Sequence, residues 1–145
     1  MNYEKPLKTF VEFRSDKFPA LPGEEDQINP GIWGKRLADF LRDGLRGEGI
    51  ETGEAINEDW GWIVPVVNAE FNLWIGCGNQ GNSDEFTCFI EPNKPYIRKF
   101  FIKKIETATR INALQAAMEK VLEKEPAISD IRWRTEEESK NPAGS

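Results

Sequence analysis

The sequence predicts a single α+β domain, a two-layer sandwich in which two principal helices cover one face of a mainly antiparallel sheet. Three observations lead to this fold class. Alternation of apolar and polar residues between Trp60 and Glu91 indicates a β-meander. Two amphipathic helical segments bracket the meander. Consecutive strands of a meander pair antiparallel, so both helices can pack on the same side of the sheet.

Two elements are expected before the meander. Residues 9–13 alternate in polarity and predict a first strand, followed by a proline- and glycine-containing loop over residues 15–27. A helix should then begin with Asn29 as its N-cap and Pro30 as its first residue, because both residue types favour those positions. Gly47 should end this helix, whose apolar stripe is Trp33, Leu37, Phe40 and Leu41.

The meander is expected to hold a short edge strand at residues 50–56 and further strands at residues 60–67, 70–77 and 86–91. Asn68 and Ala69 would form a two-residue turn, which sets Val64 opposite Leu73. The same register places Trp60, Trp62 and Cys77 on the face that packs under the helices.

The last third of the chain leaves one alternative open. Residues 94–105 suit either a short helix or an extended segment. A second principal helix is expected over residues 107–125, because apolar residues recur at helical spacing and Pro126 ends the pattern. A last strand follows at residues 128–134. The domain should therefore span residues 1–134, and residues 135–145 should form a polar, disordered tail.

The second face of the predicted sheet is more apolar than a solvated face should be, since it carries Ile63, Trp74 and Phe89. Either a segment from residues 15–27 or 94–105 covers these side chains, or they form an exposed apolar patch that binds another molecule. We favour the covering segment.

The composition excludes several classes of function. The chain has no histidine, which removes Ser–His and Cys–His nucleophile pairs and imidazole metal ligands. Two cysteines without histidine, Cys77 and Cys88, cannot form a four-ligand zinc site. We therefore expect no catalytic residues, no metal and no cofactor. An acid–base hydrolase that uses Glu58 and Asp59 is the enzymatic alternative.

The formal net charge of −6 argues against nucleic acid and anionic membranes as partners and favours a basic protein. A basic run between Lys94 and Lys104 is interpreted as a solvated surface. The sequence shows no export signal and no apolar run of about 18 residues, so we expect a cytoplasmic protein.

Acidic residues gather in two stretches. Residues 48–59 contain five carboxylates and no Lys or Arg, and residues 24–26 add three more. Such stretches steer a basic partner, and an adjacent tryptophan can anchor it. The expected partner-binding residues are Glu24, Glu25, Asp26, Glu51, Glu54, Glu58, Asp59 and Trp60.

Three segments carry a resemblance: Glu58-Asp59-Trp60-Gly61-Trp62, Phe89-Ile90-Glu91-Pro92 and Ile128-Ser129-Asp130-Ile131-Arg132-Trp133. They resemble a group of small uncharacterised bacterial α/β proteins, similar in style to immunity proteins that neutralise bacterial toxins. The resemblance implies a non-enzymatic interaction protein, with an immunity protein that neutralises a basic toxin as its specific form, and it maps no catalytic residue. A small-ligand binding module walled by Trp60, Trp62 or Trp74 is the other alternative.

Overall fold

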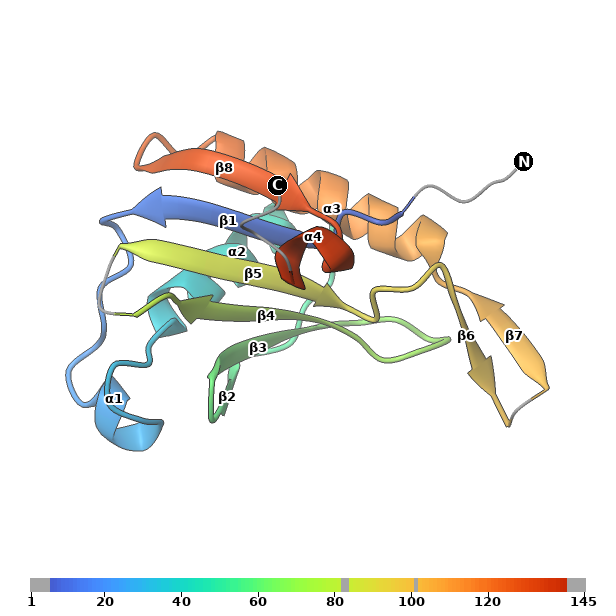
Figure 1. Ribbon diagram of the computed structural model, residues 1–145, viewed down its shortest axis with the longest axis horizontal. Helices are drawn as coiled ribbons and strands as arrows, with labels where there is room; N and C mark the ends of the chain where they lie inside the picture. The colour runs from blue at the N-terminus through green and yellow to red at the C-terminus, as the bar shows by residue number, and fades with distance from the viewer. Residues whose placement is uncertain (1–5, 82–83, 101, 141–145) are drawn as a thin grey trace.

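The computed structural model describes residues 6–81, 84–100 and 102–140. Its main sheet has six strands in the order β2-β3-β4-β5-β1-β8, and all neighbouring pairs run antiparallel. Two helices, α2 and α3, lie behind this sheet in Figure 1. This arrangement confirms the predicted α+β fold. The main-sheet strands are β1 (Phe10–Ser15), β2 (Ile56–Glu58), β3 (Gly61–Val66), β4 (Leu73–Asn79), β5 (Glu85–Glu91) and β8 (Ile128–Arg134).

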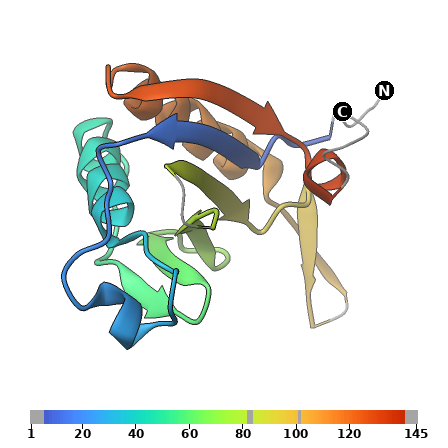
Figure 2. The ribbon, with the colours of Figure 1, turned by 60° about the vertical axis from the view of Figure 1, so that its left-hand side comes forward.

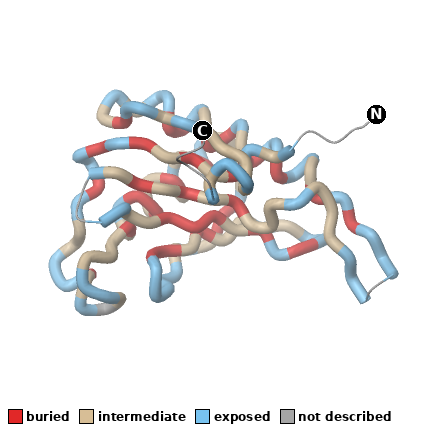
Figure 3. Tube along the Cα trace, in the orientation of Figure 1, coloured by how far each residue is buried: buried red, intermediate tan, exposed pale blue. Residues whose placement is uncertain are grey.

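The core lies between the sheet and the two long helices, α2 (Lys35–Gly47) and α3 (Ala108–Glu123). Apolar side chains of both helices meet alternate residues of the central strands, and Figure 3 marks buried residues in red along these strands. No helix in the described ranges is long and apolar enough to cross a membrane. Fully buried side chains include Leu37, Leu41, Leu45, Ile111, Leu114, Met118, Val11, Val64, Ile75 and Ile90.

Helix α2 ends at Gly47 as predicted, but it begins at Lys35 rather than after Asn29. The carboxylate of Glu24 accepts hydrogen bonds from the backbone amides of Gly34 and Lys35, at 2.9 and 2.8 Å. These amides need an acceptor because they have no partner within the helix. The expected cap, Asn29, instead donates its side-chain amide to the carbonyl oxygen of Asp59.

The β3–β4 hairpin has a longer connection than predicted, and its register is shifted by two residues. Val64 pairs with Ile75, and Val66 pairs with Leu73, so residues 67–72 form the loop. Phe71 causes this change, since its buried side chain joins the core from the loop. A shift of two residues leaves every side chain on its predicted face.

Trp60 is the exception, and its predicted position under the helices is wrong. It lies in the turn between β2 and β3, so the alternation of the strand does not extend through it. Gly61 starts β3 at a close approach, where a Cβ atom would overlap the carbonyl oxygen of Cys77 in β4. Trp62 faces the core, with 6% of its surface exposed.

Within residues 94–105, the described residues 96–99 and 103–105 are extended, so the short helix is not formed there. These residues contribute to a separate two-stranded sheet of β6 (Tyr96–Lys99) and β7 (Lys103–Glu106), which lies beyond one end of the main sheet in Figures 1 and 2. Two short helices were not predicted. One is α1 (Glu24–Gln27), within the expected loop, and the other is α4 (Glu136–Lys140), within the expected disordered tail. Residues 141–145 of that tail lie outside the described residues.

Candidate interaction site

Four aromatic side chains gather on the sheet face opposite α2 and α3. The ring centroid of Phe89 lies 5.3 Å from that of Trp60 and 5.7 Å from those of Trp74 and Phe10. Trp60 and Trp74 lie 6.3 Å apart. These separations are typical of favourable aromatic pairs. Trp60 is 40% exposed, so the cluster is accessible to another molecule.

Gly76 makes room for this cluster. It is the cross-strand partner of Phe89 in β5 and of Ile63 in β3. A Cβ atom at Gly76 would overlap the Phe89 ring, which therefore lies directly over the glycine backbone. An aromatic ring over a cross-strand glycine covers backbone that would otherwise lack a packing partner. The predicted apolar patch of Ile63, Trp74 and Phe89 thus forms one surface around Gly76, and none of its three side chains is fully buried.

The segments expected to cover this face pack elsewhere, so the covering segment that we favoured is wrong. Phe18 of the loop is buried, with its ring 5.2 Å from Phe40 of α2 and 5.8 Å from Phe86. Ile105 of the β6–β7 hairpin is buried in the same core cluster, against which Ile97 packs. Ile97 also borders a shallow hollow of about 410 Å³ beside Trp74, at one end of the aromatic face.

Two predicted acidic residues directly precede Trp60 in the chain. Glu58 ends β2 and Asp59 lies in the turn, and both side chains are exposed. The hydrogen bond from Asn29 to the Asp59 carbonyl holds the segment after α1 against this turn, and helix α1, which contains Asp26, lies at the same end of the molecule (Figures 1 and 2). Among the described residues, no basic side chain forms an ion pair with Glu58, Asp59 or Asp26.

Glu24 does not belong to this surface, which corrects its predicted role in partner binding. Only 3% of it is exposed. Its carboxylate accepts four hydrogen bonds, from the amides of Leu21, Gly34 and Lys35 and from the indole of Trp62. The neighbouring Glu25 is half-buried and accepts a hydrogen bond of 2.6 Å from the Gly31 amide. Both residues organise the loop before α2.

The remaining carboxylates of the acidic stretch at residues 48–59 lie between the end of α2 and the start of β2. Glu54 pairs with Arg42 at 2.8 Å and with Arg46 at 3.1 Å, so α2 supplies cations that the local sequence lacks. Glu48 likewise pairs with Lys124 of α3 at 2.7 Å. Glu51 is exposed near the far end of β3, where its carbonyl accepts the Val67 amide. The acidic stretch therefore does not form one uncompensated cluster.

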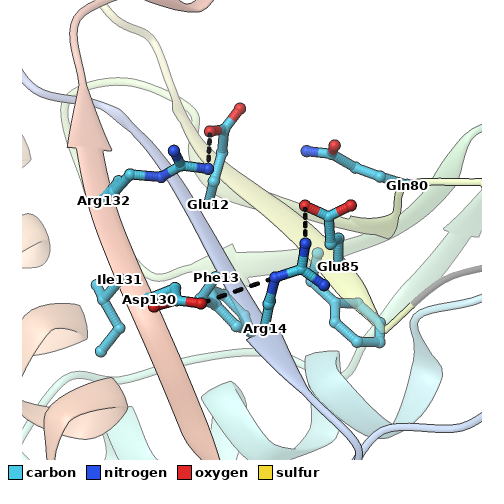
Figure 4. A pocket seen from close by; sticks show the side chains of 9 residues that line it. Glu12, Phe13, Arg14, Gln80, Glu85, Asp130, Ile131 and Arg132 are labelled. Carbon is cyan, nitrogen blue, oxygen red and sulfur yellow. Dashed lines mark ion pairs between the residues drawn. The ribbon is translucent and has the colours of Figure 1, made fainter.

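A charged hollow of about 360 Å³ lies across β5, β1 and β8 (Figure 4). Its carboxylates are paired with arginines: Glu12 with Arg132 at 3.4 Å, and both Glu85 and Asp130 with Arg14 at 3.3 and 3.7 Å. Glu58 and Asp59 do not line it. Because each acid here serves an ion pair, the arrangement favours a role in joining three strands over acid–base chemistry.

Among the described residues, burial is the largest cause of a raised pKa in two groups, Glu91 and Cys88. Burial, followed by the nearby Glu136, raises the pKa of Glu91 above its ordinary range. Burial and contact with Cys77 raise the pKa of the Cys88 thiol, and the two cysteines are cross-strand partners within the core. A thiol held protonated and buried is a poor nucleophile. No group of three or more His, Cys, Asp or Glu side chains in the described ranges could hold a metal ion.

Comparison with family models, curated proteins and solved structures finds no match to this chain. The site therefore rests on its own geometry. Sequence reasoning found Trp60, Ile63, Trp74 and Phe89 but missed Phe10 and the function of Gly76. The available signal was Gly76 itself, a glycine between two large apolar residues on neighbouring strands.

Proposed function

We propose that the protein is a non-enzymatic interaction protein that binds a basic protein partner. The binding region is the acid–aromatic surface, which we define as Glu58, Asp59, Trp60, Trp74 and Phe89. One observation carries the proposal. Trp60 is 40% exposed and its ring contacts Trp74 and Phe89, and it directly follows in the chain two exposed acidic residues that have no ion pair with a described residue.

The chemistry of this surface suits an arginine or lysine side chain. A cation over an indole ring gains about 0.5–2 kcal/mol, depending on how far it is desolvated. A carboxylate beside the ring adds a charge-assisted hydrogen bond and selects arginine by its forked geometry. A rigid aromatic anchor next to charged groups is also typical of residues that dominate binding energy at interfaces.

The specific form that we propose is an immunity protein that neutralises a basic toxin. The net charge of −6 supports it, because long-range attraction raises the rate at which an inhibitor meets a basic enzyme. The short segments that resemble a group of small uncharacterised bacterial proteins, similar in style to immunity proteins, add support, since they include Glu58, Asp59, Trp60 and Phe89 of the proposed surface.

Affinity capture from the organism that encodes the chain tests this function. The bait variants are Trp60→Ala and the pair Glu58→Lys with Asp59→Lys. The matched control is Glu119→Lys with Glu123→Lys, which changes the net charge equally on α3, behind the sheet. We expect a basic protein that wild type and control retain, and that both site variants lose. An acidic partner, or one retained by both site variants, would overturn the proposal.

A small-ligand binding role is the second candidate, favoured by the hollow of about 410 Å³ in which Trp74 lies near Glu91. Trp62 cannot contribute to it, because its side chain is buried under the helices. A screen of metabolites by tryptophan fluorescence tests this role. A saturable change that Trp74→Phe abolishes would support it, whereas an unchanged spectrum across the screen would count against it.

A further inference from the structure

The β6–β7 hairpin carries an apolar tip that the fold does not use. Phe100 and Ile102 are 84% and 85% exposed, more than any other large hydrophobic side chain in the described ranges. Phe100 also has a left-handed backbone with φ of 53°. This conformation is uncommon for a bulky residue and costs about 1 kcal/mol or more. Burial of the Phe100 side chain within this chain does not offset this backbone cost, and Ile102 is equally unburied.

Cations surround this tip on both faces of the hairpin. Arg98 pairs across the strands with Lys104, and Lys99 pairs with Lys103. Successive pairs in a two-stranded ribbon point to opposite faces, so each face presents one pair of cations. All four are exposed, and none forms an ion pair with a described carboxylate.

Two consecutive cation–cation pairs oppose formation of the hairpin, because like charges directly across a ladder are destabilising. Among the described residues, one contact offsets this repulsion: a cation–π contact in which Lys104 Nζ lies 3.9 Å from the centre of the Tyr96 ring. The repulsion is removed once anions bind between and around the four side chains. The arrangement therefore favours an anionic partner.

The base of the hairpin is fixed to the domain. Ile105 is 6% exposed and belongs to the core, and the amides of Thr107 and Ala108 both donate to the carbonyl of Pro95. The hairpin therefore presents its tip at a defined place beyond the main sheet, as Figures 1 and 2 show.

We propose that this tip docks on an anionic phospholipid surface. Phe100 and Ile102 enter the boundary between headgroups and acyl chains, while Arg98, Lys99, Lys103 and Lys104 contact the phosphates above them. The position of the apolar and basic residues along the hairpin favours a phospholipid surface over a nucleic acid. Apolar side chains lie outermost and cations lie directly behind them on both faces, which matches the depth profile of a bilayer. A nucleic acid would use the cations but would leave Ile102 in water.

The distribution of charge determines the orientation of the molecule on an anionic membrane. Residues 94–106 contain five cations and one carboxylate, although the whole chain has a net charge of −6. The turn with Glu58 and Asp59 lies at the opposite end of the molecule in Figure 1. An anionic bilayer attracts the first end and repels the second. Anionic membranes were not expected as partners because the net charge of the whole chain is negative. Since the positive and negative charges lie at different ends of the molecule, the net charge does not exclude membrane binding.

Sedimentation with vesicles tests the proposal on the full chain. We expect wild type to bind vesicles of equal parts phosphatidylcholine and phosphatidylserine, to bind pure phosphatidylcholine far less, and to be released by salt. Phe100→Ser with Ile102→Ser should lose binding. Lys99→Gln with Lys103→Gln should weaken it roughly 30-fold, at about 1 kcal/mol for each cation. The matched control, Arg110→Gln with Lys120→Gln on α3, should bind nearly as wild type.

Several outcomes would overturn the lipid proposal. These are no sedimentation with anionic vesicles, equal binding to both vesicle types, or full binding by the Phe100→Ser, Ile102→Ser variant. Binding of polyuridylate instead, lost in the Lys99→Gln, Lys103→Gln variant, would assign nucleic acid and contradict it. Trp60→Ala should sediment as wild type, so failure here leaves the function proposed for the acid–aromatic surface untouched.

Discussion

The indole nitrogen of Trp62 donates a hydrogen bond of 2.8 Å to Oε2 of Glu24, a residue that precedes it by 38 positions. The same oxygen accepts hydrogen bonds from the backbone amides of Gly34 and Lys35. One buried carboxylate therefore joins strand β3, the start of helix α2 and the loop before it. This contact ties α1 to strand β3, and the hydrogen bond from Asn29 to the Asp59 carbonyl then holds the segment after α1 against the β2–β3 turn that carries Trp60.

Replacement of Glu24 by alanine should destabilise the fold by about 2–4 kcal/mol. It leaves several buried donors without an acceptor, and each such donor costs about 1–3 kcal/mol. Glu24→Gln should lose less, because it keeps one acceptor oxygen. Urea unfolding measures both changes. An alanine variant as stable as wild type would show that the carboxylate does not anchor α2.

Alanine at Gly76 should lower stability by about 1–3 kcal/mol, because its Cβ displaces the Phe89 ring from the backbone that it covers. The displaced ring should also change the fluorescence of Trp60 and Trp74, which contact it. Gly47→Ala is the control, since a Cβ at Gly47 meets no atom within 4 Å. Equal stability of the two variants would refute the role given to Gly76.

The raised pKa of Glu91 predicts a pH-dependent gain from Glu91→Gln. Its folded-state pKa lies above its unfolded value, so the contribution of Glu91 to stability is highest at low pH and falls as pH rises from about 4.3 through the folded-state pKa. Glutamine has no charge to desolvate, so the variant should have a slightly higher Tm at pH 7. The gain should vanish below about pH 4. Thermal melts across this range measure it, and a gain that persists at low pH would reject the electrostatic cause.

The thiols of Cys77 and Cys88 should resist alkylation in the folded protein. Both side chains are fully buried, and the raised pKa of Cys88 keeps its thiol protonated at neutral pH. Labelling with iodoacetamide, counted by mass spectrometry, should become rapid only in denaturant. Rapid labelling of the native protein would contradict the core position of this pair.

The parts of the fold that sequence predicts well are those set by local pattern. β8 was predicted at its observed bounds, and α3 differs from its predicted range by two residues or fewer at each end. Apolar periodicity and Pro126 are local signals. The start of α2 was missed because its cap, Glu24, comes from another segment. The β3–β4 register was missed because Phe71 enters the core from the loop.

The candidate site likewise has a part that local sequence patterns predict and a part that depends on tertiary contacts. Alternation along β3, β4 and β5 places Ile63, Trp74 and Phe89 on one face, and the structure puts them there. Trp60 joins them only because a turn and the close approach at Gly61 reverse its direction. The neutralisation of Glu54 by Arg42 and Arg46 requires α2 to lie beside the sheet edge, which no local pattern specifies.

The central claim, that Trp60 anchors a basic partner beside Glu58 and Asp59, is tested most directly by the Kd of the captured partner. Calorimetry at low and high salt should compare wild type with Trp60→Ala, with the Glu58→Lys, Asp59→Lys pair, and with the control pair on α3. We predict that Trp60→Ala weakens binding by about 30-fold or more, as expected of a binding anchor that contributes about 2 kcal/mol. The charge-reversed pair should bind weakly and with little response to salt. A Kd for Trp60→Ala within about twofold of wild type, a difference below about 0.5 kcal/mol, would contradict the claim.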